Sequence, residues 1–476
     1  MGFRRWVFIV LIVLFPFQLG AVTLPQPQSG IETPLISIDL QQQLDNASST
    51  DLISVIVRLK PTADFENLPT TSRANRQEEL ILRLQSTALS SQLPFRTWLY
   101  EKQRQGSSSA PTFYWSINAF ALQSTPDVIK QLSLFSSVLS ITPDTVFDAP
   151  VAFVNSTIEP NLSQIKVDAI WDQGWDGFGV VVASLDTGVD YTHPDLFIRW
   201  RGGTNSWFDP YQQHSTPYDP FGHGTGVMGV MVGGSAGGTA IGIAPGARWI
   251  SAKIFNDTGK ATTSAIHSAF QWILDPDQNP ATPDAPNVLN NSWGGFVPGC
   301  NPEFQPDLQV LVAAGILPIF AAGNLGPTAS SNASPANLPE AFSVGSVDSS
   351  DLIAPSSSRG PSNCTPNAIY PNLVAPGVNI NSAERYSLFG SFSGTSFSAP
   401  HAAGLLALIL QAYPTLTLDQ QREALLAATH DLFPSGLDND TGVGRLDALV
   451  GFDWLFCTFG FPAALPQKIY LPLIQH

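Results

Sequence analysis

Six apolar or small residues in a row, Val180-Val181-Val182-Ala183-Ser184-Leu185, run directly into Asp186-Thr187-Gly188. An unbroken apolar run of this length, closed by a turn signal, is typical of a strand buried on both faces of a sheet. Such strands belong to parallel sheets, in which functional side chains gather where the strands end. The stretch therefore predicts an α/β domain and marks Asp186 as a candidate site residue.

The same texture continues along the chain after this strand. Two further apolar runs predict buried strands, at Trp249–Phe255 and Leu317–Ala321. Strands that alternate with helices predict a parallel sheet covered by helices on both faces. We expect this α/β domain to occupy residues 151–455. Segments with the apolar spacing of helices lie at residues 223–231, 262–273 and 306–314.

The chain before this domain follows a different pattern. It has one alternating, β-branched run, a helical stretch weakened by a proline, and two further strand-like runs separated by a helix that Thr125 opens. These signals predict a small α+β domain within residues 22–150. The four segments are residues 51–60, 73–104 (with Pro94), 114–122 and 137–141.

The first residues carry a separate signal. Arg4 and Arg5 precede a short apolar run, Trp6–Phe15, and the small residues Gly20-Ala21 follow. A basic patch, an apolar core and small residues are typical of a secretory signal peptide, here residues 1–21. Because the apolar run is shorter than the roughly 20 residues that cross a bilayer, we expect a secreted protein without a membrane span in its mature form.

Composition excludes two classes of protein. Of the 476 residues, 43% are hydrophobic and 13% are charged, which is typical of a globular chain and not of a disordered one. Asp and Glu number 38 against 22 Lys and Arg, giving a net charge of −16, so the chain lacks the basic surface that nucleic-acid binding requires. An exported chain favours one disulfide among Cys300, Cys364 and Cys457, and the sequence leaves the pairing open.

Three polar residues join Asp186 as candidates for a functional site. His223 lies between glycines at the expected start of a helix, where the neutral form that a general base needs is favoured. Asn324 follows a strand run, where its amide can donate to an oxyanion. Ser396 opens an apolar helical run. Each has an ordinary explanation alone, as a structural histidine, a turn asparagine or a helix cap, but together they are the parts of a serine hydrolase.

Two other patterns bear on the chemistry. Asp-Thr-Gly is also the motif of aspartic proteases, which need two such aspartates. The further copies at Asp257 and Asp440 follow asparagines and indicate turns instead. Asn290–Gly295 predicts a strand that runs into glycines, whose backbone can pair with an extended peptide. Simple packing is the alternative explanation for Trp293 within it.

The chain order Asp186, His223, Ser396 differs from the order in α/β-hydrolases and in chymotrypsin. With its surrounding segments it resembles the subtilisin-like serine proteases, or subtilases, over residues 165–450. Asn291-Ser292-Trp293-Gly294 resembles the bacillopeptidase F-like branch of that family. The other matching segments are Asp186-Thr187-Gly188-Val189-Asp190, His193-Pro194-Asp195-Leu196, Gly222-His223-Gly224-Thr225, Ala321-Ala322-Gly323-Asn324 and Gly394-Thr395-Ser396-Phe397-Ser398-Ala399-Pro400-His401.

This resemblance implies a serine endopeptidase that forms an acyl-enzyme on polypeptide substrates and needs no cofactor for its chemistry. It implies that Ser396 is the nucleophile, that His223 is the base, and that Asp186 orients the histidine. Asn324 is then a donor to the oxyanion. The residues implied to line the substrate groove are Ser292, Trp293 and Gly294.

The resemblance also implies a role for the leading α+β domain, as a ferredoxin-like inhibitory propeptide. The chain would be an autoprocessed zymogen, its own propeptide acting as an intramolecular inhibitor until it is cut away between Phe147 and Glu159. We expect the mature enzyme to be a secreted monomer, with residues 456–476 as a C-terminal tail.

Two positions depart from the family pattern. Gly226 stands where the family usually has a second, non-catalytic histidine. Asp195 matches a calcium ligand of some relatives, but the loop that would complete that site, residues 234–239, has no matching asparagine or acid. The sequence therefore leaves structural calcium open, at Asp195 or at oxygen ligands elsewhere in this acidic chain.

Two other functions compete with the peptidase. A secreted protein that only binds peptides would use the same fold, but the complete set of catalytic residue types argues against it. An esterase would carry its serine in a Gly-x-Ser-x-Gly turn, and no such motif surrounds Ser396.

Overall fold

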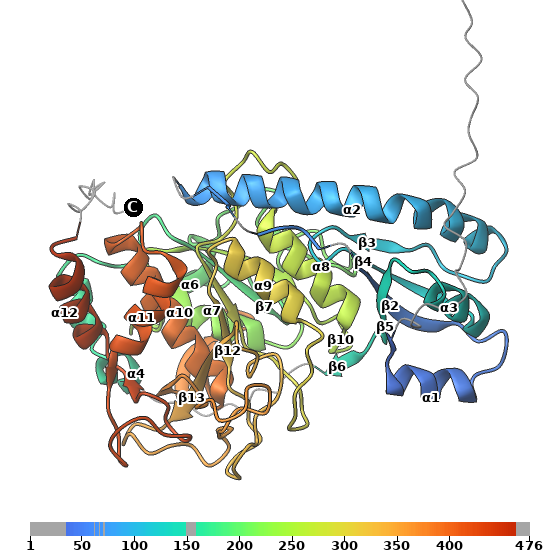
Figure 1. Cartoon of the computed structure of the whole chain (residues 1–476). Helices are drawn as coiled ribbons and strands as arrows, with labels where there is room; N and C mark the ends of the chain where they lie inside the picture. The colour runs from blue at the N-terminus through green and yellow to red at the C-terminus, as the bar shows by residue number, and fades with distance from the viewer. Residues whose placement is uncertain (1–34, 61, 66, 70–71, 149–158, 463–476) are drawn as a thin grey trace, which may run out of the picture.

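The computed structural model describes residues 35–60, 62–65, 67–69, 72–148 and 159–462, which form two units (Figure 1). A smaller unit contains a five-stranded sheet, and a larger unit is built on a nine-stranded sheet. Three predicted features lie wholly or mostly outside the described residues: the signal peptide, the C-terminal tail over residues 456–476, and the cleavage segment between Phe147 and Glu159.

The nine-stranded sheet confirms the predicted α/β fold. Its strands are β7 (Val181–Asp186), β8 (Trp207–Phe208), β9 (Arg248–Lys253), β11 (Val288–Asn291), β12 (Pro318–Ala321), β13 (Phe342–Val347), β14 (Leu373–Pro376), β17 (Thr429–His430) and β18 (Arg445–Leu446). They lie in the order β17-β18-β14-β13-β12-β11-β7-β9-β8. All neighbours pair in parallel except β17 with β18. The three predicted buried strands are β7, β9 and β12.

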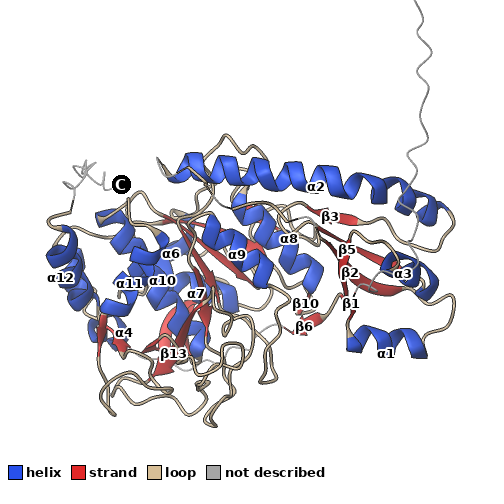
Figure 2. Ribbon diagram, viewed as in Figure 1, coloured by secondary structure: helices blue, strands red, loops and turns tan. Residues whose placement is uncertain are grey.

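Helices cover both faces of this sheet (Figure 2). Two of them, α7 (His223–Val232) and α10 (Thr395–Ala412), pack on one face, and α8 (Thr263–Leu274) and α9 (Gln305–Ala313) pack on the other. Because successive strand residues point to opposite faces, Val182 joins the first core and Leu185 joins the second. The remaining elements described here are α4 (Pro160–Gln164), α5 (Asp168–Asp172), α6 (Pro194–Phe197), α11 (Leu418–Ala427), α12 (Ala448–Phe459) and a hairpin of β15 (Ile380–Glu384) and β16 (Leu388–Phe392).

The smaller unit combines a mostly antiparallel sheet with helices. Its elements are β1 (Leu35–Ile36), α1 (Ile38–Asn46), β2 (Ile53–Leu59), α2 (Arg73–Arg104), β3 (Thr112–Tyr114), β4 (Ala119–Ser124), α3 (Pro126–Ser133) and β5 (Val138–Pro143), with strand order β1-β5-β2-β4-β3. Pro94 lies inside α2 without ending it. The single strand predicted over residues 114–122 was wrong: β3 and β4 form a hairpin whose turn contains Asn118 at a φ of 48°. Asparagine adopts this left-handed conformation more readily than most residues.

The long helix α2 connects the two units. Leu80 and Leu84, in its first half, pack in the core beneath α8 and α9, whereas Phe95 and Leu99 belong to the core of the smaller unit. Figure 1 shows α2 lying along one side of both units. The helix α2 therefore contributes side chains to the apolar cores of both units.

The described cysteines resolve a question that the sequence left open. Cys300 and Cys364 form a disulfide, and Cys457 is an exposed free thiol. The disulfide joins the segment after β11 to the loop that follows β13, which lie 64 residues apart in the chain.

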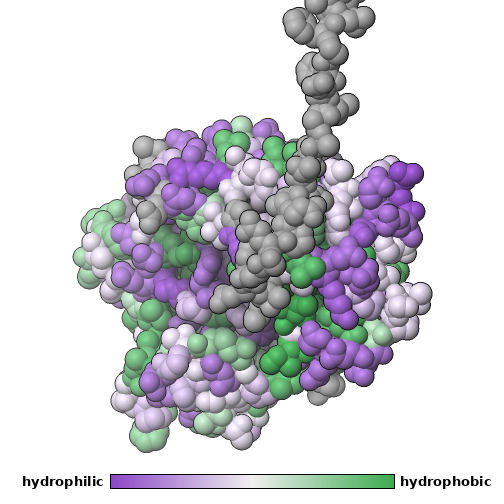
Figure 3. All heavy atoms as spheres, turned by 45° about the vertical axis from the view of Figure 1, so that its right-hand side comes forward, coloured by the Kyte–Doolittle hydropathy of each residue, from purple (hydrophilic) through white to green (hydrophobic). Residues whose placement is uncertain are grey.

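The surface is mixed in character. Figure 3 turns the smaller unit toward the viewer and shows polar and apolar side chains interspersed over this face. Among the helices in the described part of the chain, none has the length and apolarity needed to cross a bilayer.

Candidate active site

Asp186 and His223 meet at the carboxyl end of the central sheet. Asp186 is the last residue of β7, and His223 is the first residue of α7. Gly222 caps that helix at a φ of 86°, a conformation that favours glycine. Oδ1 of Asp186 lies 2.7 Å from Nδ1 of His223 and also accepts a hydrogen bond from the main chain of Thr187. Both side chains are almost fully buried, so the pair has one arrangement and little access to water.

The charge of Asp186 favours the protonated form of His223. Burial opposes the charged imidazolium, but the charge and hydrogen bond of Asp186, with the charge of Asp219, raise the pKa of His223 above its ordinary value. The two carboxylates thus act against the preference for the neutral form that was expected from the helix start. Nε2 of His223 is buried without a hydrogen-bond partner in the described residues, which leaves it available to a reacting group.

Ser396 lies in the first turn of α10, beside this pair. Gly394, not Ser396, is the N-cap residue of the helix, so the helix-cap explanation for the serine is wrong. Oγ of Ser396 donates to the main-chain oxygen of Ser292 at 3.2 Å, and Oγ of Ser292 donates to the main-chain oxygen of Ser396 at 2.7 Å. The neighbouring ring of Phe397 packs edge-on against the imidazole of His223, with 5.5 Å between the ring centres. The structure therefore brings Ser396, Ser292 and His223 into one place.

Asn324 reaches the same place from the loop after β12. Its Oδ1 accepts two hydrogen bonds from Thr395, one from the main-chain nitrogen at 3.0 Å and one from Oγ1 at 3.1 Å. Its Nδ2 makes the close approach to Gly394, where an added Cβ would lie only 3.2 Å away. The amide is thus held with its donor end beside the start of α10.

The segment Ser292–Gly294 lies in this region, but Trp293 does not face a groove with its side chain. The indole is buried and packs edge-on against Phe304 and Phe320, at ring-centre distances of 5.6 and 5.7 Å. Simple packing, the alternative that the sequence left open, describes this side chain.

A short strand missed by the sequence analysis forms another edge of the region. β10 (Lys260–Thr262) pairs antiparallel with β6 (Val146–Asp148), which is the last described segment of the smaller unit. The pair shows that this edge accepts an extended segment by strand addition. Three residues without an apolar run gave no strand signal, and only the turn at Gly259 marked their position.

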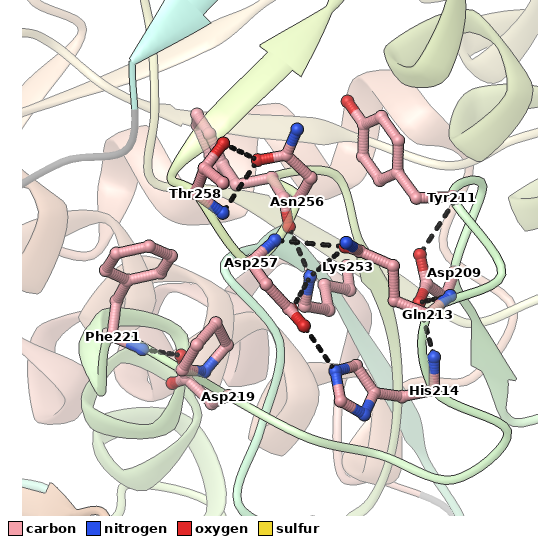
Figure 4. Close-up of polar contacts among 12 residues, drawn as sticks. Asp209, Tyr211, Gln213, His214, Asp219, Phe221, Lys253, Asn256, Asp257 and Thr258 are labelled. Carbon is pink, nitrogen blue, oxygen red and sulfur yellow. Dashed lines mark hydrogen bonds and ion pairs between the residues drawn. The ribbon is translucent and has the colours of Figure 1, made fainter.

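A polar network that reaches from the buried Lys253 to the surface borders the site (Figure 4). Lys253 ends β9 directly opposite Asp186 in the sheet register, and its fully buried ammonium lies 2.9 Å from Oδ1 of Asp257. The other oxygen of Asp257 lies 2.9 Å from Nε2 of His214. Asp257 begins a turn, and its carboxylate pairs with Lys253 and His214. In an aspartic protease the catalytic aspartate lies beside a second carboxyl group instead. Asp440 likewise lies in a turn.

Asp195 lies apart from these residues, at the start of α6. Its Oδ1 accepts a hydrogen bond from the main chain of Ala236 at 2.8 Å, and the guanidinium of Arg199 donates to its main-chain oxygen at 3.0 Å. Calcium prefers six to eight oxygen ligands, several of them carboxylates. One carboxylate beside an arginine, in a loop without a second acid, does not fit that preference. The other oxygen of Asp195, Oδ2, is buried without a hydrogen-bond partner in the described residues, but this one carboxylate supplies fewer ligands than calcium prefers.

Comparison with known proteins places the whole arrangement in a family. Residues 177–444 match the subtilase family. The chain is 33% identical over 411 residues to bacillopeptidase F of Bacillus subtilis (strain 168), covering 78% of this chain and 28% of that protein. It is 32% identical over 314 residues to subtilisin amylosacchariticus of Bacillus subtilis subsp. amylosacchariticus (65% of this chain, 74% of that protein).

A third relative matches a similar share of the chain. Serine protease AprX of Bacillus subtilis (strain 168) is 32% identical over 378 residues, which cover 73% of this chain and 81% of AprX. The subtilase match includes the central sheet and all four polar residues that meet at its carboxyl edge, Asp186, His223, Asn324 and Ser396. The chain therefore belongs to the subtilase family of subtilisin-like serine proteases.

Proposed function

We propose that this protein is a secreted serine endopeptidase, made as a zymogen, that cleaves polypeptides through an acyl-enzyme on Ser396. The observation that carries the proposal is the 2.7 Å contact between Asp186 and His223, with Nε2 of the histidine left free beside the first turn of α10. This is the arrangement that a base needs in order to take a proton from a serine.

The proposed reaction begins when Oγ of Ser396 turns from the carbonyl of Ser292 and attacks the scissile carbonyl carbon. His223 takes the hydroxyl proton at Nε2, and Asp186 stabilises the imidazolium that forms. The oxyanion receives hydrogen bonds from Nδ2 of Asn324 and from the main-chain N–H of Ser396 at the helix start. His223 then gives its proton to the leaving amine, and a water molecule, activated by the same histidine, hydrolyses the acyl-enzyme.

We propose the smaller unit as the inhibitory propeptide, within residues 22–150, followed by a catalytic domain over residues 151–455. The pairing of β6 with β10 supports this role, because a strand added beside the site occupies the position of an extended substrate. Phe147, in the middle of β6, packs against Phe304 next to Trp293, with 6.0 Å between the rings of Phe147 and Phe304.

Helix ends support the same docking. The carboxylate of Asp144 accepts the main-chain N–H and the hydroxyl of Ser264, at 2.8 and 2.6 Å, in the first turn of α8. At the carboxyl end of α9, the main-chain oxygens of Ala313 and Ala314 accept hydrogen bonds from Arg76 and Gln77 of α2. An acid at a helix start and donors at a helix end satisfy main-chain groups that the helices leave unpaired. The smaller unit is therefore fitted to this surface of the larger one.

Secretion and a monomeric state complete the proposal. The sequence of residues 1–21 is that of a signal peptide, and the disulfide between Cys300 and Cys364 suits an oxidising compartment.

The test combines labelling with self-processing. The purified protein is treated with a serine-directed phosphonyl reagent, mapped by mass spectrometry and assayed on casein. We expect the label on Ser396, hydrolysis of casein, and shortening of the chain by the propeptide mass that Ser396→Ala abolishes. An unlabelled Ser396 without casein hydrolysis would contradict the peptidase, and shortening that persists in Ser396→Ala would contradict self-processing.

A further inference from the structure

The helix that carries His223 begins without a cap from its own N-cap residue. Gly222 occupies that position in α7, and it has no side chain to accept the main-chain N–H groups of the first turn, which the helix itself leaves unpaired. Asp219 supplies the acceptor instead. Its Oδ2 accepts the main-chain N–H of Thr225 at 2.9 Å, and its Oδ1 accepts that of Phe221 at 3.0 Å (Figure 4). Asp219 is therefore the cap of α7.

The carboxylate of Asp219 is buried in its charged form. The residue is 3% exposed, and its Oδ2 also accepts the hydroxyl hydrogen of Thr225 at 2.6 Å. A carboxyl group that accepts N–H and O–H groups at both oxygens has the hydrogen-bond pattern of the ionised form. Burial raises the pKa of Asp219, while the hydrogen bonds from Thr225 and Phe221 act in the opposite direction by stabilising the charge. A negative charge thus lies at the start of α7, where it complements the helix dipole.

A single hydroxyl group joins this cap to the loop that follows β7. Oγ1 of Thr225 donates to Asp219 and accepts the main-chain N–H of Asp190 at 2.9 Å. A second hydrogen bond joins the same two segments, because Oγ1 of Thr187 accepts the main-chain N–H of Gly224 at 2.9 Å. Thr187 directly follows the proposed acid in the chain, and Gly224 directly follows the proposed base. The cap therefore fixes the start of α7 against the end of β7.

We propose that Asp219 is a positioning residue of the peptidase, which holds the first turn of α7 in place and stabilises the positive charge that His223 gains when it takes the proton of Ser396. The inference rests on the proposed function, since it names a further residue for the same reaction. Burial lowers the pKa of His223, but the charge and hydrogen bond of Asp186, followed by the charge of Asp219, raise it and outweigh burial. Asp186 acts by direct contact with the ring, and Asp219 acts through space.

Other charged groups lie near His223, on the elements that surround it. They are Asp186 of β7, Asp190 in the loop after β7, Lys253 of β9, and Glu384 and Arg385 at the end of β15. The last two form an ion pair at 3.2 Å, and Lys253 lies 2.9 Å from Asp257, so close partners offset these charges. Asp190 is partly exposed, and solvent screens its charge. From α10 an uncharged aromatic ring faces the imidazole. Asp219 is therefore the buried negative charge that adds to the contacting carboxylate of β7.

The test uses the full-length chain, in which Asp219→Asn removes the charge and keeps the shape of the side chain. The matched control is Asp447→Asn, because Asp447 is also a fully buried helix cap, which accepts the main-chain N–H of Val450 at 3.2 Å at the start of α12. In the Ser396→Ala background, which prevents self-digestion, the pKa of His223 is measured by NMR of protein with isotope-labelled histidine, and His223→Gln assigns the signal. The same variants with Ser396 intact are assayed for kcat and KM on a peptide substrate from about pH 5 to 9.

We expect Asp219→Asn to lower the pKa of His223 by at least about half a unit and to move the acid limb of kcat/KM to lower pH by the same amount. Its kcat should fall with little change in KM. Asp447→Asn should keep the parent's pKa and pH profile. An unchanged pKa of His223 in Asp219→Asn, or an equal shift in Asp447→Asn, would overturn the proposal. An inactive parent would contradict the peptidase and not the effect of Asp219 on His223, which the NMR measurement decides on its own.

A second pair of variants tests the cap even where Asp219→Asn fails to fold. Thr225→Val removes the hydroxyl that joins the cap to Asp190 and keeps the charge of Asp219, so kcat should fall about fivefold while the acid limb of kcat/KM stays in place. Thr225→Ser keeps the hydroxyl and should recover most of the loss. Equal kcat in Thr225→Val and Thr225→Ser would contradict the positioning role.

Discussion

Thr395 holds Asn324 by the acceptor end of its amide, because the main-chain nitrogen and Oγ1 of Thr395 both donate to Oδ1 of Asn324. An amide whose oxygen is engaged twice has its Nδ2 donor pointing the other way. That donor lies beside Gly394, at the start of the helix that carries Ser396. The residue before the proposed nucleophile thus orients the proposed oxyanion donor.

This relationship predicts a graded series of variants. Asn324→Ala should lower kcat about 10²–10³-fold with little change in KM, a magnitude that comes from subtilisin itself. Thr395→Val keeps the main-chain hydrogen bond but loses the one that Oγ1 donates to Asn324 and the one that Oγ1 accepts from the main-chain N–H of Gly323. The loss of the bond to Asn324, worth about 1 kcal/mol, should lower kcat about fivefold. Thr395→Ser is the control and should stay close to the parent. A change in KM at constant kcat, measured on a peptide substrate, would contradict the orienting role.

The docking of the smaller unit predicts a change in the timing of activation. Arg58 lies 2.9 Å from Oε1 of Glu303, and both side chains are mostly buried. Arg58→Ala removes a charged hydrogen bond worth about 2 kcal/mol, or about 30-fold in affinity. The cleaved propeptide should then dissociate sooner, and the lag before casein hydrolysis should shorten.

The control for this experiment is Arg104→Ala, which removes an exposed arginine paired within α2 at 3.6 Å from Glu101. Its lag should equal that of the parent. An equal lag in Arg58→Ala would show that the contact with Glu303 does not contribute to docking.

Much of the fold follows from local pattern. The apolar run at 180–185 predicted β7, and the helical spacing of residues 223–231 predicted α7, because each signal lies within one element. The residues of the candidate site were recognised for the same reason, since each follows a strand or begins a helix. Their residue types in this chain order then indicated the chemistry.

Features that depend on contacts between distant segments were not predicted. The turn at Asn118 has no glycine or proline, so two strands were taken for one. The pairing of Cys300 with Cys364 and the strand β10 exist only because folding brings remote segments together.

The disulfide predicts a large loss of stability on reduction. Cross-linking Cys300 and Cys364, 64 residues apart, removes about 4 kcal/mol of loop entropy from the unfolded chain in the entropic model. In the Ser396→Ala background, the double substitution Cys300→Ser and Cys364→Ser should lower the free energy of unfolding by about this amount, which appears as a lower urea midpoint. Cys457→Ser changes an exposed free thiol and should leave the midpoint unchanged. Equal midpoints for the parent with and without reductant would contradict the prediction.

The buried histidine inside α10 predicts a loss of stability in mild acid. His401 is fully buried; its Nδ1 donates to the main-chain oxygen of Phe397 at 2.7 Å, and its Nε2 accepts from Asn161 at 3.0 Å. Burial lowers the pKa of His401 to about 4. Because the unfolded chain takes up this proton near pH 6.5 and the folded chain does not, the stabilisation is complete above pH 6.5 and is lost as the pH falls toward 4.

The loss should reach about 3 kcal/mol, which is the pKa difference multiplied by about 1.4 kcal/mol per unit. His401→Asn keeps a donor for the Phe397 carbonyl but does not titrate in this range. In the Ser396→Ala background its free energy of unfolding, measured in urea from pH 7.5 to 4.5, should start lower than that of the parent and decline less steeply. The difference between the two curves isolates this histidine from the other titrating groups. Parallel curves would contradict the prediction, because His401 would then take up its proton equally in the folded and the unfolded protein.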